Sequence, residues 1–210
     1  MIKVLRLRVI FAALGLVLGL LALADLASQI TTATDSEAPL SARTGGVRNV
    51  FLLLSPSYAH REAQASATAV LAGPPATNRR DLEPWVTELL SLSPTNSALW
   101  LSLAKLSQAG PPAEAKRAAD ALVMSYLTAP NDLELIPLRL KIVSTMNTPP
   151  DPLLEDLVRG DIRTILLGKV DLRSQLADAY RIATPSSKAF ILQTAKDMDP
   201  RFAATLAPVR

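Results

Sequence analysis

Apolar residues follow two different patterns along the chain. An unbroken apolar run, Val9–Ala24, follows three basic residues and is closed by Asp25. Further along, apolar residues recur at the three- and four-residue spacing of a buried helix face. The clearest stripe consists of Leu82, Trp85, Val86, Leu89 and Leu90. The pattern predicts a membrane-directed segment at residues 1–30, followed by a helical body.

The three basic residues in front of the apolar run are Lys3, Arg6 and Arg8. A basic flank before an apolar segment keeps the N-terminus in the cytosol and sends the rest of the chain across the membrane. The apolar run is long enough for a helix of about 20 residues that spans a bilayer. Ala22-Leu23-Ala24 also resembles a signal-peptide cleavage site. We expect a retained anchor, with release after Ala24 as the alternative.

The segment 31–50 is rich in Thr, Ser, Ala and Gly, and we expect it to be a flexible linker. The exported domain then covers residues 51–210, where prolines and glycines separate a series of helical segments. The expected helices are Ser57–Leu71, Arg80–Ser91, Asn96 or Ser97 to Gln108, Pro112–Thr128, Leu133–Met146, Leu153–Leu167, Asp171–Ile182 and Pro185–Met198. Gly160 is a point at which the sixth helix could break. No segment alternates like a half-buried strand, so the predicted fold class is all-α.

Within this body, two neighbouring helices carry a pattern of bulky and small residues. The pattern consists of Trp100, Leu103 and Ala104 in one helix, Ala118, Leu122 and Ser125 in the next, and Pro130 after it. It resembles the tetratricopeptide repeat, in which small residues allow paired helices to approach closely. The resemblance implies helical hairpins over residues 80–146, stacked as a repeat-like array.

The chain departs from the family pattern in three places. The turn containing Pro111 and Pro112 is longer than usual, Ser107 stands where an aromatic residue is expected, and Pro137 lies within the following helix. An irregular helical bundle therefore stays open as an alternative to the repeat-like array, because alternating Ala and Leu suits both.

Composition and charge exclude several kinds of chemistry. The chain has no cysteine, which excludes disulfides and thiolate metal sites. Its net charge of +3 comes from basic residues scattered among acids, so nucleic-acid binding is not expected. His60 is the single histidine and has no second histidine to support a metal site. We expect no cofactor, no metal and no catalytic residue.

Several charged residues have simpler structural interpretations. Asp151-Pro152 is interpreted as a helix start, where an acid complements the helix dipole. Arg79-Arg80 is assigned to a helix N-terminal turn rather than to an anion site. The charges from Asp161 to Arg181 are interpreted as a solvated helix face with short-range pairs.

These features favour an interaction protein over an enzyme. The expected protein is a helical scaffold in the bacterial envelope, tethered to the inner membrane by a single pass, with its C-terminal domain in the periplasm. Its expected partner is another envelope protein, held in grooves between helices. Assistance in surface polysaccharide synthesis or export is expected by analogy with other small anchored helical-repeat proteins. The alternative is a soluble periplasmic helical enzyme or ligand-binding protein released after Ala24.

Overall fold

The computed structural model describes residues 56–73, 79–146 and 151–206 of the chain. Within these ranges the chain is helical and contains no strand, as predicted. The α-helices are α3 (Pro56–Ala72), α4 (Arg79–Leu92), α5 (Ser97–Gln108), α6 (Ala115–Thr128), α7 (Ile136–Ser144), α8 (Pro152–Leu167), α9 (Arg173–Ile182), α10 (Pro185–Met198) and α11 (Pro200–Leu206). Two short 3-10 helices, η3 (Pro112–Glu114) and η4 (Val170–Leu172), precede α6 and α9.

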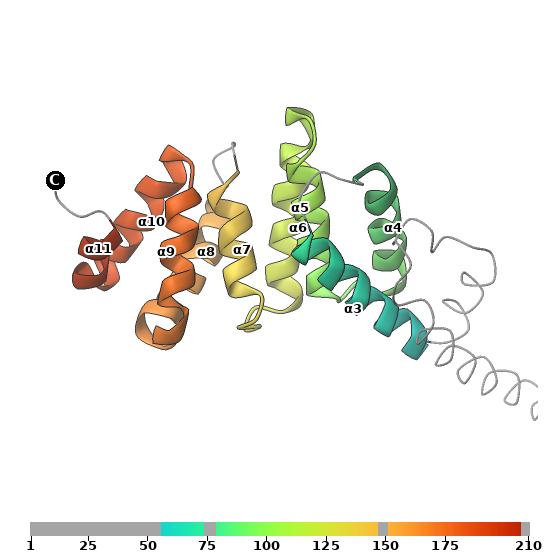
Figure 1. Cartoon of the computed structure of the whole chain (residues 1–210), viewed down its shortest axis with the longest axis horizontal. Helices are drawn as coiled ribbons and strands as arrows, with labels where there is room; N and C mark the ends of the chain where they lie inside the picture. Colours follow the sequence, from blue (N-terminus) through green and yellow to red (C-terminus); the bar gives the residue numbers. More distant parts are fainter. Residues whose placement is uncertain (1–55, 74–78, 147–150, 207–210) are drawn as a thin grey trace, which may run out of the picture.

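The helices lie side by side in an elongated row, with α3 and α4 at one end and α11 at the other (Figure 1). Most helices pack on a neighbour in sequence and also on the next helix but one. Thus α5 contacts both α3 and α7, α6 contacts α8, α7 contacts α9, and α8 contacts α10. This alternation gives two layers along the row, and the α5–α6 pair has the most extensive contact.

One continuous apolar core runs through the row, from Ala63 in α3 to Ala203 in α11. The predicted helix faces supply it: Trp85, Val86, Leu89 and Leu90 of α4 are all buried. Burial of such aliphatic and aromatic side chains is the main stabilising contribution to the fold. The apolar stripes in the sequence therefore identified the inward faces correctly.

Polar residues begin several of these helices. The side chain of Asn96 accepts a hydrogen bond from Leu99 N (3.1 Å) at the start of α5. Asp151 accepts one from Leu154 N (2.8 Å) at the start of α8, which confirms its predicted role. Each bond satisfies a backbone N–H that lacks a partner in the first helical turn.

Most helices begin or end within three residues of the prediction, and four differences are informative. α7 begins at Ile136 rather than Leu133, because Pro137 has no N–H to donate and fits best in a first turn. α4 is one residue longer than expected at each end, and Pro84 lies inside it. α8 continues through Gly160, around which there is open space. The C-terminal apolar segment forms the short helix α11, which was not predicted.

None of the described helices combines the length and the apolar character needed to cross a bilayer. The predicted membrane segment 1–30, with Lys3, Arg6 and Arg8, lies outside the described residues. The predicted linker 31–50 also lies outside them.

Candidate functional site

An open groove of about 620 Å³ lies where the C-terminal ends of α3, α5 and α7 meet. Residues at the ends of α3 and α5 and residues of α7 line it together; the ends of α5 and α7 are at the top of Figure 1, and α3 runs obliquely to them. Apolar residues line much of the groove, among them Leu71, Leu138 and Ile142. Its size lies within the range of cavities that hold a ligand or several side chains.

Lys105 of α5 holds the end of α3 against the groove. Its ammonium group donates hydrogen bonds to the carbonyl oxygens of Val70 (3.0 Å), Leu71 (2.8 Å) and Gly73 (2.7 Å). These carbonyls have no partner within their own helix, because the last turn of a helix leaves four acceptors free. Burial lowers the pKa of Lys105, and the nearby charge of Lys141 lowers it further. The three hydrogen bonds fix the ammonium group in position.

Gln108, one turn after Lys105, holds the end of α7 in the same way. Its side-chain amide donates to the carbonyl oxygen of Ile142 (3.0 Å) and to the hydroxyl of Thr145 (2.9 Å). α5 thus binds both neighbours through one turn of polar side chains. These bonds join three helices at one place, so the groove is part of a rigid framework.

The lining of the groove is positively charged. Lys105 and Lys141 both line it, and its lining contains no carboxylate. Lys141 is exposed and forms no ion pair within the described ranges 56–73, 79–146 and 151–206. The site is consequently a largely apolar groove that carries two ammonium groups.

A second polar cluster is buried between α6, α7 and α8. Arg139 is fully buried and donates to the carbonyl oxygens of Ser125 (2.7 Å) and Ala129 (2.9 Å) and to the Ser125 hydroxyl (3.2 Å). Its guanidinium carbon lies 4.5 Å from the centre of the Tyr126 ring. The Tyr126 hydroxyl in turn donates to a carboxylate oxygen of Asp161 (2.8 Å). This cluster is enclosed by the core and is a structural connection rather than a binding site.

The charges from Asp161 to Arg181 were interpreted as a solvated helix face, and this interpretation is wrong for Asp161. Its residue is only 4% exposed, because α8 turns this position towards Tyr126. Burial raises the pKa of its carboxyl group to about 6, against the opposing effects of the Tyr126 hydrogen bond and the Arg139 charge. The interpretation holds for Arg181, which pairs with Asp178 on the surface.

The raised pKa predicts a specific pH dependence. Between the ordinary carboxyl pKa of about 4 and the folded value, the folded chain binds the proton more readily than the unfolded chain does, so this group's contribution to stability falls as the pH rises. Asp161→Asn still accepts the Tyr126 hydrogen bond but cannot titrate. From pH 4 to pH 7 the natural chain should lose up to about 3 kcal/mol relative to this variant. Urea unfolding followed by Trp fluorescence measures the difference, and parallel pH profiles would contradict it.

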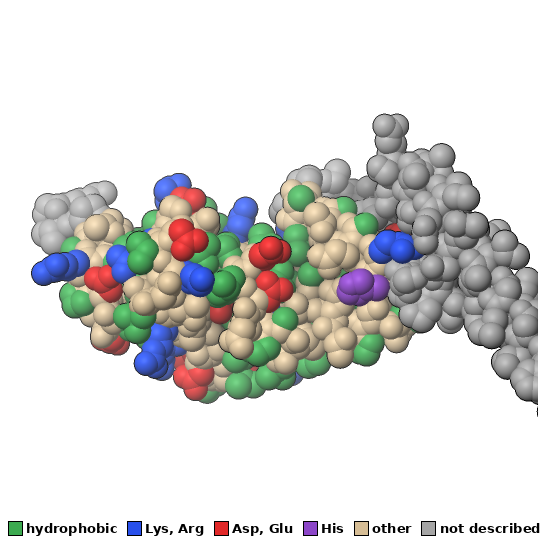
Figure 2. Space-filling model, turned by 90° about the horizontal axis from the view of Figure 1, so that it is seen from below, with side chains coloured by type: hydrophobic (Ala, Val, Ile, Leu, Met, Phe, Trp, Pro, Cys, Tyr) green, Lys and Arg blue, Asp and Glu red, His purple; other side chains and the backbone are tan. Residues whose placement is uncertain are grey.

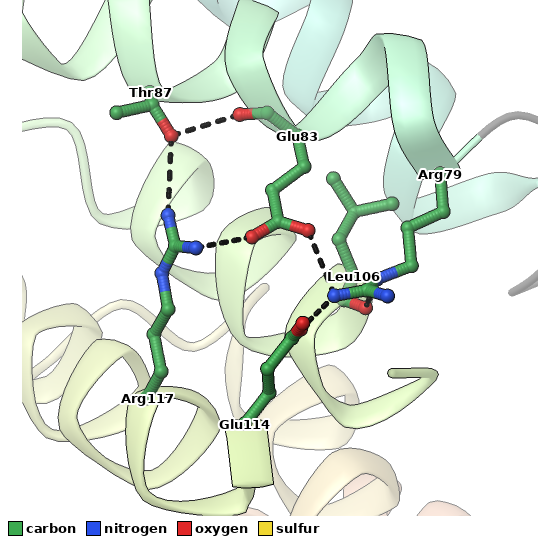
Figure 3. A network of polar contacts seen from close by, with 6 residues as sticks. All are labelled: Arg79, Glu83, Thr87, Leu106, Glu114 and Arg117. Carbon is green, nitrogen blue, oxygen red and sulfur yellow. Dashed lines mark hydrogen bonds and ion pairs between the residues drawn. The ribbon is translucent and has the colours of Figure 1, made fainter. Parts of the chain in front are cut away.

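A third polar cluster joins α4, α5, η3 and α6 on the surface (Figure 3). Arg79 forms ion pairs with Glu83 (3.0 Å) and with Glu114, and also donates to the Leu106 carbonyl oxygen (2.9 Å). Arg117 of α6 pairs with Glu83 from the other side. Arg79 is the first residue of α4, in agreement with its predicted place in an N-terminal turn. Its charge is already paired, so this cluster fixes helix positions.

His60 lies at the opposite end of the helices from the groove. It is exposed, appears in purple in Figure 2, and borders a shallow hollow of about 380 Å³ with Asn96, Asp132 and Glu134. No group of three or more potential metal ligands occurs among the described residues. Acidic and basic side chains are interspersed on the face shown in Figure 2.

The predicted repeat-core residues occupy one part of the fold. Leu103, Ala104, Ala118, Leu122 and Ser125 are all buried at or near the α5–α6 contact. Trp100 is half-buried, and its indole N–H donates to the Pro94 carbonyl oxygen (2.7 Å). Pro130 is exposed between α6 and α7. These residues shape the α5–α6 hairpin, and none of them lines the groove.

The groove residues were not identified from the sequence. One signal was present: Lys105 and Lys141 are separated by about 36 residues, the same interval as Pro94 and Pro130. A basic residue in the last turn of a helix is, however, common because it complements the helix dipole. The sequence alone therefore could not show that Lys105 and Lys141 also line a groove.

Comparison with known proteins gives no relative: no family model, no curated protein and no solved structure matches this chain.

Proposed function

We propose that the chain is a membrane-tethered helical scaffold of the bacterial envelope, which binds a segment of a partner protein in the groove between α3, α5 and α7. The observation that carries the proposal is the groove itself, which is open, apolar and held rigid by Lys105 and Gln108. A preformed groove lowers the ordering cost of binding, because only the incoming segment loses freedom.

The spacing of contacts between helices supports a repeat-like architecture similar to the tetratricopeptide repeat. Ser102 of α5 donates to the carbonyl oxygen of Ala67 in α3, 35 residues earlier. Tyr126 of α6 donates to Asp161 of α8, again across 35 residues. Equivalent helices of successive hairpins would be separated by about this interval. Such arrays typically present grooves to partner proteins.

The tether comes from the sequence alone. Lys3, Arg6 and Arg8 in front of Val9–Ala24 favour a single inner-membrane pass with the helical body in the periplasm. A role in surface polysaccharide synthesis or export rests on analogy with small anchored helical proteins. The groove supports binding of a partner segment and is independent of that analogy.

The proposal is tested by photo-crosslinking in living cells. A photoreactive amino acid replaces Ala109, which is exposed in the groove and has ordinary helical backbone angles. Replacement of Ala189, exposed on α10 outside the groove, is the matched control. Membranes are washed with carbonate and the adducts are identified by mass spectrometry. We expect a reproducible protein adduct at Ala109 that is absent at Ala189, with the full-length chain retained in the membrane pellet.

A further inference from the structure

The positive charge of the groove indicates what kind of segment it binds. This inference rests on the proposed function. We propose that the bound segment is an acidic stretch of the partner protein, with Asp or Glu side chains placed between apolar ones. The apolar side chains would lie against Leu71, Leu138 and Ile142, and a carboxylate would lie between Lys105 and Lys141.

Lys105 and Lys141 line the same groove, and the positive charge of Lys141 lowers the pKa of Lys105. An anionic group between them would add two attractions at shorter distance, which together exceed the repulsion between the two ammonium groups. Lys105 is already immobilised by three hydrogen bonds, so little side-chain freedom remains to be lost there. Lys141 is exposed and free to adjust to the incoming carboxylate.

The C-terminal ends of the helices repel an anion, but this effect is weaker than the attraction by the two ammonium groups. The C-terminus of a helix carries about half a negative charge, and this effect is confined to its last turn. Three such ends meet at the groove, and the side chains of Lys105 and Gln108 already satisfy carbonyls of α3 and α7. Two full ammonium charges therefore exceed the partial charges of the three helix ends.

A protein segment fits this groove better than a nucleic acid does. Binding to a phosphate backbone requires many cationic contacts, whereas the groove lining offers two. Its apolar walls instead suit an extended segment whose apolar and acidic side chains alternate.

An array of ten-residue peptides tests the inference with the full chain in detergent micelles. Acidic probes alternate Leu, Ile or Val with Asp or Glu; matched neutral probes carry Asn or Gln, and matched basic probes carry Lys. The chain's own residues 31–49 are included as a further probe. Three variants are compared with the natural chain: Lys141→Glu, Lys169→Glu as an exposed control outside the groove, and Ala109→Trp to fill the groove.

We expect the natural chain to bind acidic probes at least about tenfold more tightly than neutral ones, because opposite charges favour the correct partner and like charges exclude the wrong one. Lys141→Glu should shift the preference to basic probes, Lys169→Glu should leave it unchanged, and Ala109→Trp should abolish binding.

The other outcomes separate the two proposals. Equal binding of acidic and neutral probes that Ala109→Trp abolishes would overturn the charge inference and leave the proposed function intact. Tightest binding to residues 31–49 would also overturn the inference, since the occupant would then belong to this chain. If no probe bound, or if every probe still bound to Ala109→Trp, both proposals would be contradicted.

Discussion

Replacing Arg139 with leucine is expected to lower the free energy of unfolding by about 3–5 kcal/mol, because it removes a buried hydrogen-bonded charge and leaves the charge of buried Asp161 uncompensated. The carbonyl oxygens of Ser125 and Ala129 each lose one of their donors, and the Tyr126 ring loses the guanidinium that covers it. The Asp161 carboxylate is left buried without a positive charge nearby. The loss should be larger at pH 7 than at pH 5, since Asp161 is protonated more readily in acid.

Urea unfolding of the full chain measures this loss through the fluorescence of Trp85 and Trp100, which both lie in the helical body. Arg181→Leu is the matched control, because the Arg181 side chain is 75% exposed and its pair with Asp178 lies on the surface. A surface change of this kind is expected to alter stability by no more than about 0.5 kcal/mol. The double variant Arg139→Leu/Asp161→Leu should be less destabilised than Arg139→Leu, because it leaves no unpaired buried charge. Equal effects at positions 139 and 181 would refute the structural role of Arg139.

Leu122→Ala should be the next most damaging change, at about 2–5 kcal/mol, through lost burial and the cavity left behind. Leu122 is fully buried in α6, within the most extensive helix contact of the fold. The cost should be high in this range because α5 and α8 hold α6 from two sides and limit collapse around the cavity.

Leu127→Ala provides the control for this prediction within the same helix. Leu127 is 59% exposed, so its truncation removes little buried surface and should cost less than about 1 kcal/mol. The same urea titration compares the two variants. If both lost the same stability, the orientation of α6 would be wrong.

The helical architecture could be predicted from local signals in the sequence. The stripe from Leu82 to Leu90 identified the buried face of α4, and the Gly and Pro residues between segments marked the helix boundaries. Asp151 was recognised as a helix start because its role depends only on the residues that follow it. The start of α7 was predicted three residues too early, and the position of Pro137 explains this shift.

Buried polar residues could not be predicted in the same way. Arg139 and Asp161 look like surface charges in the sequence, because their partners lie on adjacent helices rather than one turn away. Lys105 and Gln108 likewise bind carbonyls more than 30 residues distant along the chain. Such contacts depend on how the hairpins stack, and a single sequence carries no direct record of that stacking.

The groove is therefore recognised only in three dimensions, whereas the proposed tether rests on the sequence alone. The proposed tether would restrict the helical body to the membrane surface, which would raise its effective concentration for partners held there. Even a modest affinity in the groove would then be sufficient for assembly.

The most direct test of this account is the yield of photo-crosslinked adducts at Ala109 compared with Ala189 in living cells. The account predicts a reproducible protein neighbour at Ala109 and none at Ala189. Equal yields at the two positions, or no protein adduct at Ala109, would contradict the claim that this groove holds a partner.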